Sequence, residues 1–260
     1  MFPHISFLGL GLYYWMILIG VIAAIISFRI LSFKINLSSK LYNFTLISAF
    51  FAIVIGYLSS VLFEDFYEFI ETGEWNFGSG STFYGGVIGG LFFFHLIYFL
   101  LGKKIFKEGE NIKGYKDLIS LIVISIVLAH AFGRIGCLFD GCCYGIKTDA
   151  WYGIGMHING VLEKRVPTQL IESIFLFLLY GFLVFLLLKL NLRTIPSFYM
   201  VLYGVFRFLI EFIRDDDRGS LGISFLSPSQ VIALLLIIAG VIIFILEYKK
   251  KKVKIADEKE

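Results

Sequence analysis

An arginine and three cysteines stand out in a chain whose sequence is otherwise strongly apolar. The stretch Gly133–Gly145 reads Gly-Arg-Ile-Gly-Cys-Leu-Phe-Asp-Gly-Cys-Cys-Tyr-Gly and follows a long apolar run. An arginine at a helix centre in a bilayer costs about 2.5–3.5 kcal/mol, so such a residue is more often functional than decorative. The four glycines permit turns with positive φ and the close approach of a backbone or a ligand. The stretch therefore indicates a functional site at the end of a membrane span.

A second polar set lies later in the chain and has helical spacing. Tyr203, Arg207, Glu211 and Arg214 are separated by four, four and three residues, which places them on one face of a helix. Arg207 and Arg134 offer planar, permanently charged donors that match a phosphate or a carboxylate with two hydrogen bonds. Glu211 can compensate the charge of Arg207 or act as a base. The simpler interpretation is a structural Arg207–Glu211 ion pair that only holds helices together.

The cysteines leave three interpretations open. On an extracytoplasmic face, Cys137 can form a disulfide with Cys142 or Cys143. Zinc binding is less favoured, because three thiols with this spacing lack the usual paired arrangement. The third interpretation is that the thiols are buried and inert and line a helix turn. His130, one turn before Arg134, is interpreted as a packing or hydrogen-bonded histidine.

Composition assigns the chain to the membrane proteins. Of its 260 residues, 58% are hydrophobic and only 17% are charged, whereas soluble domains are about 45–50% apolar and about 25% charged. Nothing resembles a nucleic-acid-binding module, and we expect no nucleic-acid partner. The lysine-rich end is interpreted as a basic cytoplasmic tail over residues 249–260, after a single transmembrane domain over residues 1–248.

Seven apolar runs approach or exceed the roughly 20 residues that cross a bilayer. We predict an all-α polytopic fold with the first run retained as a span, an acidic loop after the second, and a hairpin or interfacial segment over residues 146–167. Gly85 and Gly86 open a repeated pattern of small residues in the third run, which suits close helix packing. The predicted spans are about 11–33, 43–63, 84–102, 168–190, 197–214 and 230–248, together with one that runs from about Leu118 into the stretch Gly133–Gly145.

The distribution of lysine and arginine predicts the orientation. Most of the 23 basic residues lie in alternate loops and in the tail, which places the N-terminus outside and the C-terminus in the cytoplasm. Arg134, Arg207, Tyr13 and Tyr84 then all fall in the outer half of the bilayer. We therefore predict one site, opening laterally toward the outer leaflet.

The chain resembles the prolipoprotein diacylglyceryl transferases of bacteria. The resemblance covers most of the chain and is strongest at Gly133-Arg134-Ile135-Gly136 and in the segment Tyr203–Arg214. Further features occur in the family's order: Tyr13, the pair Gly85-Gly86, Pro167-Thr168-Gln169-Leu170 with Glu172, and Gln230. The seven-span architecture of that family, with an outer N-terminus, agrees with the orientation predicted from the loop charges.

This resemblance implies a reaction and its partners. The family transfers the diacylglyceryl group of phosphatidylglycerol to the thiol of a lipobox cysteine in the signal-peptide region of a preprolipoprotein, and it releases glycerol phosphate. It implies no metal or organic cofactor, and it implies a multi-pass location in the bacterial cytoplasmic (inner) membrane. The residues carried over as catalytic or substrate-binding are Arg134, Arg207, Glu211, Tyr84, Tyr13, Tyr203, Arg214, Cys137, Asp140, Cys142, Gly85 and Gly86.

Some of these positions differ in type from the family pattern. Cys137, Asp140 and Cys142 stand at positions that are usually asparagine, asparagine and glutamate, and Tyr84 stands where the family has a histidine. Tyr84 acts as a base if cations favour its phenolate. Alternatively it donates a hydrogen bond to the phosphate while the acceptor thiol loses its proton to solvent or Glu211, which we prefer because the reference pKa of a phenol is about 10.

Two other functions remain open at this point. One is a related transferase that uses a different lipid donor or acceptor. The other, from a different class, is a non-catalytic transporter that binds anions or anionic lipids, which would produce flux without a covalent product.

Overall fold

Seven long helices dominate the structure, a computed structural model that describes residues 6–75, 77–78, 80, 82–158, 161–215 and 226–257. Within these residues, seven helices are long and apolar enough to cross a membrane, which confirms the predicted all-α polytopic fold. They are α1 (Leu12–Lys34), α2 (Ser39–Thr72), α3 (Phe83–Ile105), α5 (Tyr115–Asp140), α6 (Thr168–Leu188), α7 (Ile195–Ile210, extended by the 3-10 turn η2, Glu211–Ile213) and α8 (Pro228–Asp257).

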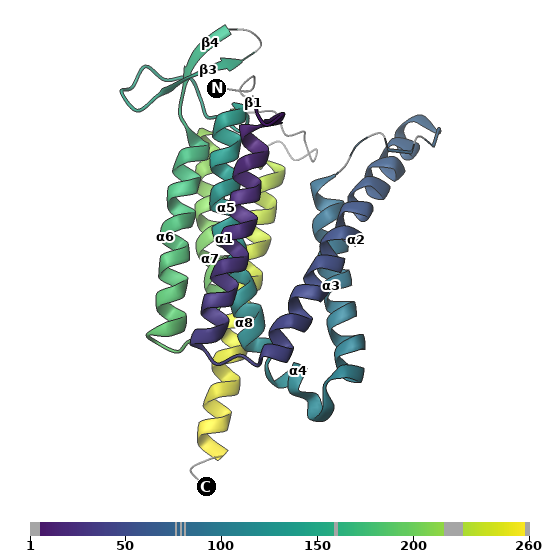
Figure 1. The fold of residues 1–260 in the computed structure, drawn as a ribbon. Helices are drawn as coiled ribbons and strands as arrows, with labels where there is room; N and C mark the ends of the chain where they lie inside the picture. Colours follow the sequence, from purple (N-terminus) through teal and green to yellow (C-terminus); the bar gives the residue numbers. More distant parts are fainter. Residues whose placement is uncertain are drawn as a thin grey trace. The chain divides into compact units, whose positions relative to one another are not determined.

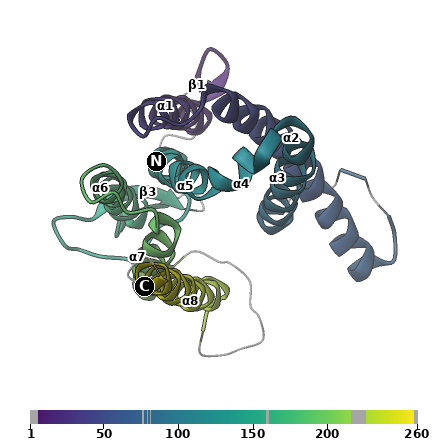
Figure 2. The same cartoon turned by 90° about the horizontal axis from the view of Figure 1, so that it is seen from below.

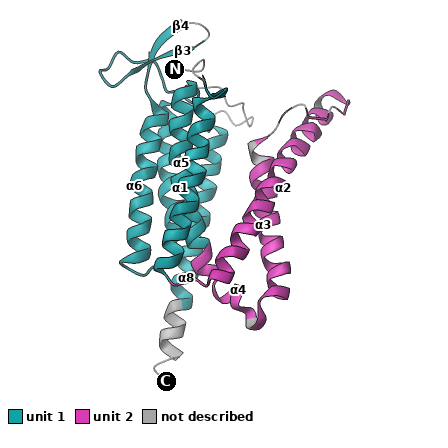
Figure 3. Ribbon diagram, viewed as in Figure 1, with its two compact units in different colours: residues 1–35, 119–260 teal, residues 36–118 magenta. Residues whose placement is uncertain are grey.

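The chain folds into two compact units, coloured separately in Figure 3. Unit 1 comprises Met1–Ile35 and Ile119–Glu260, and unit 2 comprises Asn36–Leu118. Unit 1 contains both arginine motifs and all three cysteines. Unit 2 contains α2, α3 and the glycine pair of the third predicted span.

Unit 1 is a bundle of α1, α5, α6, α7 and α8, whose axes run side by side in the two views of Figures 1 and 2. Glycines let the helices approach closely. A Cβ at Gly20 of α1 would lie 3.0 Å from the Ala129 carbonyl of α5, and one at Gly204 of α7 would lie 3.0 Å from the Ala233 carbonyl of α8. Between α6 and α7, the rings of Phe175 and Phe206 stack with centroids 3.9 Å apart. These contacts set the spacing of the helices that carry the polar residues.

Two antiparallel hairpins cover one end of this bundle (Figure 1). The first pairs β1 (Ser6–Phe7) with β2 (Leu10–Gly11), and the second pairs β3 (Ile154–Ile158) with β4 (Val161–Arg165), with Ile154 opposite Arg165. The predicted hairpin between residues 146 and 167 is therefore confirmed. The N–H of Gly145 donates to Val166 at 2.9 Å across the base of this hairpin, and the N–H of Ile146 donates to Ile213 in η2 at 3.0 Å, which connects the base to the bundle.

Unit 2 is built on the antiparallel pair α2 and α3, with the short elements η1 (Lys107–Gly109) and α4 (Glu110–Lys113) at its turn. A Cβ at Gly56 of α2 would lie 3.0 Å from the carbonyl oxygen of Gly86 and 3.1 Å from the Cα of Gly90 in α3. The predicted close packing through the small residues of the third span is confirmed. The helix against which these small residues of α3 pack is α2, the second span.

Two boundaries differ from the predicted ones. The second helix does not end near residue 63, because it continues through the acidic residues to Thr72 and ends where Gly73 adopts a left-handed conformation with φ 75°. The fourth span runs into the stretch Gly133–Gly145, as predicted: α5 continues to Asp140, and the first left-handed residue is Gly141 with φ 81°. The last helix continues past residue 248 to Asp257, because its lysines are good helix formers.

Candidate functional site

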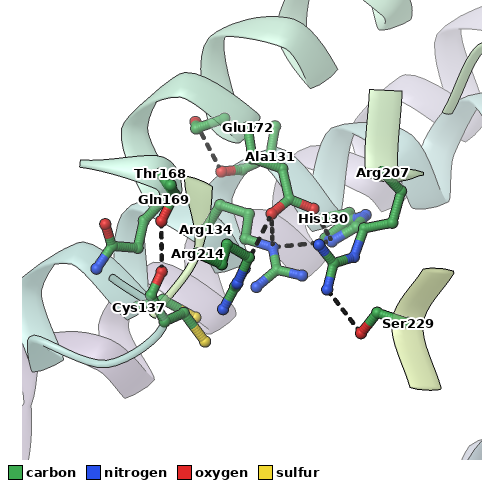
Figure 4. A network of polar contacts seen from close by, with 12 residues as sticks. His130, Ala131, Arg134, Cys137, Thr168, Gln169, Glu172, Arg207, Arg214 and Ser229 are labelled. Atoms are coloured by element: carbon green, nitrogen blue, oxygen red, sulfur yellow. Dashed lines mark hydrogen bonds and ion pairs between the residues drawn. The ribbon is translucent and has the colours of Figure 1, made fainter. Parts of the chain in front are cut away.

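A buried glutamate is the centre of the polar cluster in unit 1. Glu172 lies in the first turns of α6 with no exposed side-chain surface, and its Oε2 is 3.0 Å from Nε of Arg134 and 3.8 Å from Nη1 of Arg214. Its Oε1 accepts a hydrogen bond from the hydroxyl of Tyr203 at 2.9 Å. Figure 4 shows the side chains of Glu172, Arg134 and Arg214 close together. Because a carboxylate in an apolar interior requires opposite charges and donors, Glu172 determines where these side chains lie.

His130 completes the contacts of Arg134. The Nε of Arg134 donates to Nε2 of His130 at 3.3 Å, and the same ring nitrogen is 3.8 Å from Glu172. Because this nitrogen accepts a hydrogen bond, the imidazole is neutral in this arrangement. The prediction that His130 is a hydrogen-bonded histidine is confirmed.

Arg207 belongs to a second group of contacts between α7 and α8. Its Nη1 is 2.7 Å from Oε2 of Glu211, and its Nη2 donates to the hydroxyl of Ser229 at 2.9 Å. The other oxygen of Glu211 accepts from Ser227 at 2.7 Å. Ser227 also caps α8, because its hydroxyl accepts from the backbone N–H of Gln230 at 3.2 Å. Glu211 thus compensates the charge of Arg207, as one of the two predicted roles requires.

Arg214 joins the two groups. Its Nε lies 3.9 Å from Oε2 of Glu211, and only 2% of its side chain is exposed. The prediction of one continuous helical face is wrong at this residue, because α7 ends at Ile210 and Arg214 has extended backbone angles after the turn η2. After η2, the Nη1 of Arg214 lies 3.8 Å from Oε2 of Glu172.

The cluster brings three guanidinium groups together. Those of Arg134, Arg207 and Arg214 lie within ion-pair distance of two carboxylates, Glu172 and Glu211. All of them are less than a fifth exposed. Planar guanidinium groups match phosphate oxygens with paired hydrogen bonds. The arrangement is suited to bind a phosphate.

The three cysteines lie directly after Arg134, where α5 ends. Their sulfur atoms all lie within 4.8 Å of one another, and each cysteine is a free, half-buried thiol. The pKa of the Cys143 thiol is lowered, chiefly by the neighbouring thiols of Cys137 and Cys142 and further by the charges of Arg214 and Arg134. The thiol of Cys142 donates to the carbonyl of Cys137 at 3.8 Å. The thiols are therefore not paired in a disulfide, and they follow Arg134 closely along the chain.

The other predicted residues lie outside these contacts. Tyr13, in the first turn of α1, packs against α5 near the cysteines, since a Cβ at Gly136 would lie 3.1 Å from the ring of Tyr13. Asp140, the last residue of α5, is exposed rather than buried among the arginines. Tyr84, Gly85 and Gly86 open α3 in unit 2, so their roles stay predictions.

Two residues of this cluster, Glu172 and Ser229, were not predicted as site residues from the sequence. Glu172 was one element of the family pattern and not a predicted site residue, although an acidic residue in the first turns of an apolar span is itself a signal of function. Gln169, one turn earlier on α6, has no exposed surface and donates from Nε2 to the carbonyl of Cys142. Ser229 had no such signal, because a serine near a helix start is most simply a cap.

The base of the second hairpin carries its own ion pairs outside the predicted spans. Glu163 lies 2.5 Å from both Lys147 and Arg165, and Arg165 also pairs with Asp215. Lys147, and next Arg165, hold the pKa of Glu163 below its usual range. These pairs connect the hairpin to the segment that follows Arg214.

The fold and the site together define a class: a multi-pass membrane protein with a buried arginine–glutamate cluster suited to a phosphate group. Within that class, the family model described as "Prolipoprotein diacylglyceryl transferase" matches residues 2–246. The chain belongs to this family.

Curated relatives agree with the family match. A Clostridium tetani protein named "Phosphatidylglycerol--prolipoprotein diacylglyceryl transferase" is 33% identical over 94% of this chain and 96% of its own length. A Clostridium perfringens protein with the same name followed by the number 2 is 37% identical, over 65% of this chain and 63% of its own. One from Dehalococcoides mccartyi is 33% identical, over 84% and 81%.

Proposed function

We propose that this protein is a phosphatidylglycerol–prolipoprotein diacylglyceryl transferase. The substrates are the phospholipid phosphatidylglycerol and a preprolipoprotein, whose signal-peptide region supplies the acceptor cysteine. The location is the cytoplasmic (inner) membrane of a bacterium. Family membership over nearly the whole chain supports the reaction class, and the site chemistry supports the kind of donor.

The observation that carries the proposal is the convergence of three buried guanidinium groups, those of Arg134, Arg207 and Arg214. Phosphatidylglycerol has one negatively charged phosphodiester, whose oxygens guanidinium groups match with paired hydrogen bonds. The apolar helices around the cluster suit the acyl chains of the same lipid. The donor therefore complements the site in both charge and polarity.

The reaction is a substitution at a glyceryl carbon. The acceptor thiolate forms a C–S bond to the diacylglyceryl carbon that carries the phosphate ester, and the C–O bond to the phosphate breaks. The electron pair stays on the phosphate oxygen, and glycerol phosphate leaves. Arg134 and Arg207 stabilise the charge that develops on that oxygen, since preorganised donors in a water-poor site act most strongly there. The thiol proton goes to solvent or to Glu211.

Complementation tests this function. The gene is expressed in a bacterial strain depleted of its own transferase, and lipoprotein modification is followed by the mass of a reporter lipoprotein. We expect the diacylglyceryl adduct to return. In a matched reaction with purified protein, phosphatidylglycerol and a lipobox peptide should yield glycerol phosphate and lipidated peptide in equal amounts.

Other outcomes would contradict the proposal. Good membrane expression with no adduct on the reporter, while another phospholipid or another acceptor is modified, would support a related transferase. Anion or lipid flux without any covalent product would support a transporter. The Arg134→Gln variant, expressed at the same level, is expected to be inactive and serves as the matched comparison in each assay.

A further inference from the structure

Three thiols gather at the C-terminal end of α5, and the reaction proposed above does not use them. Cys137 lies on the last turns of the helix, whereas Cys142 and Cys143 follow it in the turn. All three sulfur atoms lie within 4.8 Å of one another. They are the only cysteines of the chain, and each is free and half-buried.

The backbone holds this arrangement in place. Gly141 and Cys143 both have left-handed backbone angles, with φ 81° and 64°. Positive φ is uncommon for a residue other than glycine, and it persists where surrounding contacts fix it. Here the contacts are hydrogen bonds from two buried residues of α6: Thr168 donates to the carbonyl of Cys143 at 2.7 Å, and Gln169 donates to that of Cys142.

The first turn of the loop is fixed as well. The backbone N–H groups of Gly141 and Cys142 both donate to the carbonyl of Cys137, at 3.0 and 3.2 Å. Each of the three cysteine carbonyls thus accepts a hydrogen bond. Contacts within the turn after α5 and contacts with α6 together fix the conformation of the loop. The thiols are held together by the fold, which is what a binding site requires.

The spacing and number of the sulfurs favour a shared ligand over a disulfide. A disulfide brings two sulfurs to about 2.05 Å and leaves the third unused. Three thiolates around one tetrahedral ion with metal–sulfur bonds of about 2.3 Å lie about 3.8 Å apart. Sulfurs already within 4.8 Å of one another need only small shifts to reach that geometry.

We propose that Cys137, Cys142 and Cys143 bind one thiophilic cation, Zn²⁺ or Cu⁺, through three thiolates. Thiolates are the soft ligands that select these two ions. Cu⁺ is satisfied by three sulfurs, whereas Zn²⁺ retains a fourth position for a small ligand. Three thiolates with either ion form a negatively charged group. The guanidinium groups of Arg134 and Arg214, in the neighbouring arginine–glutamate cluster, have the opposite charge (Figure 4).

Metal titration of the purified protein tests the site directly. The protein is reduced, freed of metal by a chelator, and titrated with Co²⁺ and Cd²⁺ as spectroscopic substitutes for Zn²⁺, and in parallel with Cu⁺. We expect one equivalent to bind with thiolate-to-metal charge-transfer absorption. Competition between Zn²⁺ and Cu⁺ at a buffered concentration of each identifies the preferred ion.

Variants assign the ligands. The single changes Cys137→Ser, Cys142→Ser and Cys143→Ser should each weaken binding at least tenfold, and the triple change should abolish the charge-transfer band. His157 is an exposed histidine on β3, and His157→Asn is the matched control that removes an adventitious ligand and should bind as the unchanged protein does. Equal binding by the triple variant and the unchanged protein would overturn the proposal.

A second measurement needs no variant. Alkylation of the reduced protein should modify three thiols without metal and protect all three when one equivalent of Zn²⁺ or Cu⁺ is present. If mild oxidation instead converts two thiols to a disulfide at the same rate with and without either metal, the cluster is a redox pair and the proposal fails. Neither readout depends on transferase activity, so the metal site and the proposed function can fail separately.

Discussion

Arg207 uses both ends of its guanidinium fork, one toward Glu211 at 2.7 Å and one toward Ser229 at 2.9 Å. A lysine keeps the charge but has one compact ammonium, which cannot make both contacts and also present a planar edge to phosphate. We expect Arg207→Lys to reduce transfer by about 100-fold, the scale for losing one preorganised donor. Arg29→Lys, a change at an exposed arginine of α1, is the matched control. Full activity of Arg207→Lys at normal expression would limit Arg207 to charge balance.

Glu172 is expected to be a positioning residue that acts through Arg134. Glu172→Gln keeps the shape but removes the charge that lies 3.0 Å from Nε of Arg134, and breaking a buried pair costs about 3–5 kcal/mol. We expect a lower unfolding temperature in detergent. A double-mutant cycle with Arg134→Gln should give a coupling free energy of at least about 0.5 kcal/mol. Additive effects of the two changes would mean that the pair is not energetically coupled.

Tyr84 stands where related sequences have a histidine, and its proposed role is hydrogen-bond donation to the phosphate. Tyr84→Phe should then slow transfer without changing its pH profile. Tyr84→His restores the usual residue and should leave a measurable rate, because imidazole also donates. Two results together would instead identify Tyr84 as the base. Tyr84→Phe would abolish transfer, and the rate of the unchanged protein would rise with pH with an apparent pKa that Tyr84→His moves to about 6.5.

Among the helices, the glycines that set the spacing of α7 and α8 allow a matched comparison. A Cβ at Gly204 would lie 2.8 Å from the side chain of Ile237 and 3.0 Å from the carbonyl of Ala233, whereas Gly181 in α6 has open space around it. Gly204→Ala should lower stability by about 1–3 kcal/mol through overpacking. Gly181→Ala should be neutral or stabilising, since alanine is the better helix former by about 1 kcal/mol. Equal unfolding temperatures for the two variants would contradict close α7–α8 packing.

The sequence was a good guide to the helices and a partial guide to the site. Apolar length predicts all seven spans, because a bilayer sets a minimum length that is visible in one dimension. The end of α2 could not be placed, since acidic residues are compatible with both a loop and a solvated helix, and Gly73 alone decides it. The contacts of Arg214 depend on the turn η2, and no periodic pattern encodes a change of helix type.

For the whole molecule, the remaining prediction is the orientation in the membrane, with the N-terminus outside and the C-terminus in the cytoplasm. Lysine-rich segments, which are retained on the cytoplasmic side, follow α3 and end the chain, whereas the segment between α2 and α3 contains no lysine or arginine. The test uses single cysteines at Ser79→Cys and Lys259→Cys, two positions outside the described residues, in the triple cysteine-to-serine background. An impermeant maleimide on intact cells should label the first and reach the second only after permeabilisation. Labelling of both positions in intact cells would contradict the predicted topology. Labelling of the tail alone would invert the orientation, and the arginine cluster would then lie in the opposite leaflet from the predicted one.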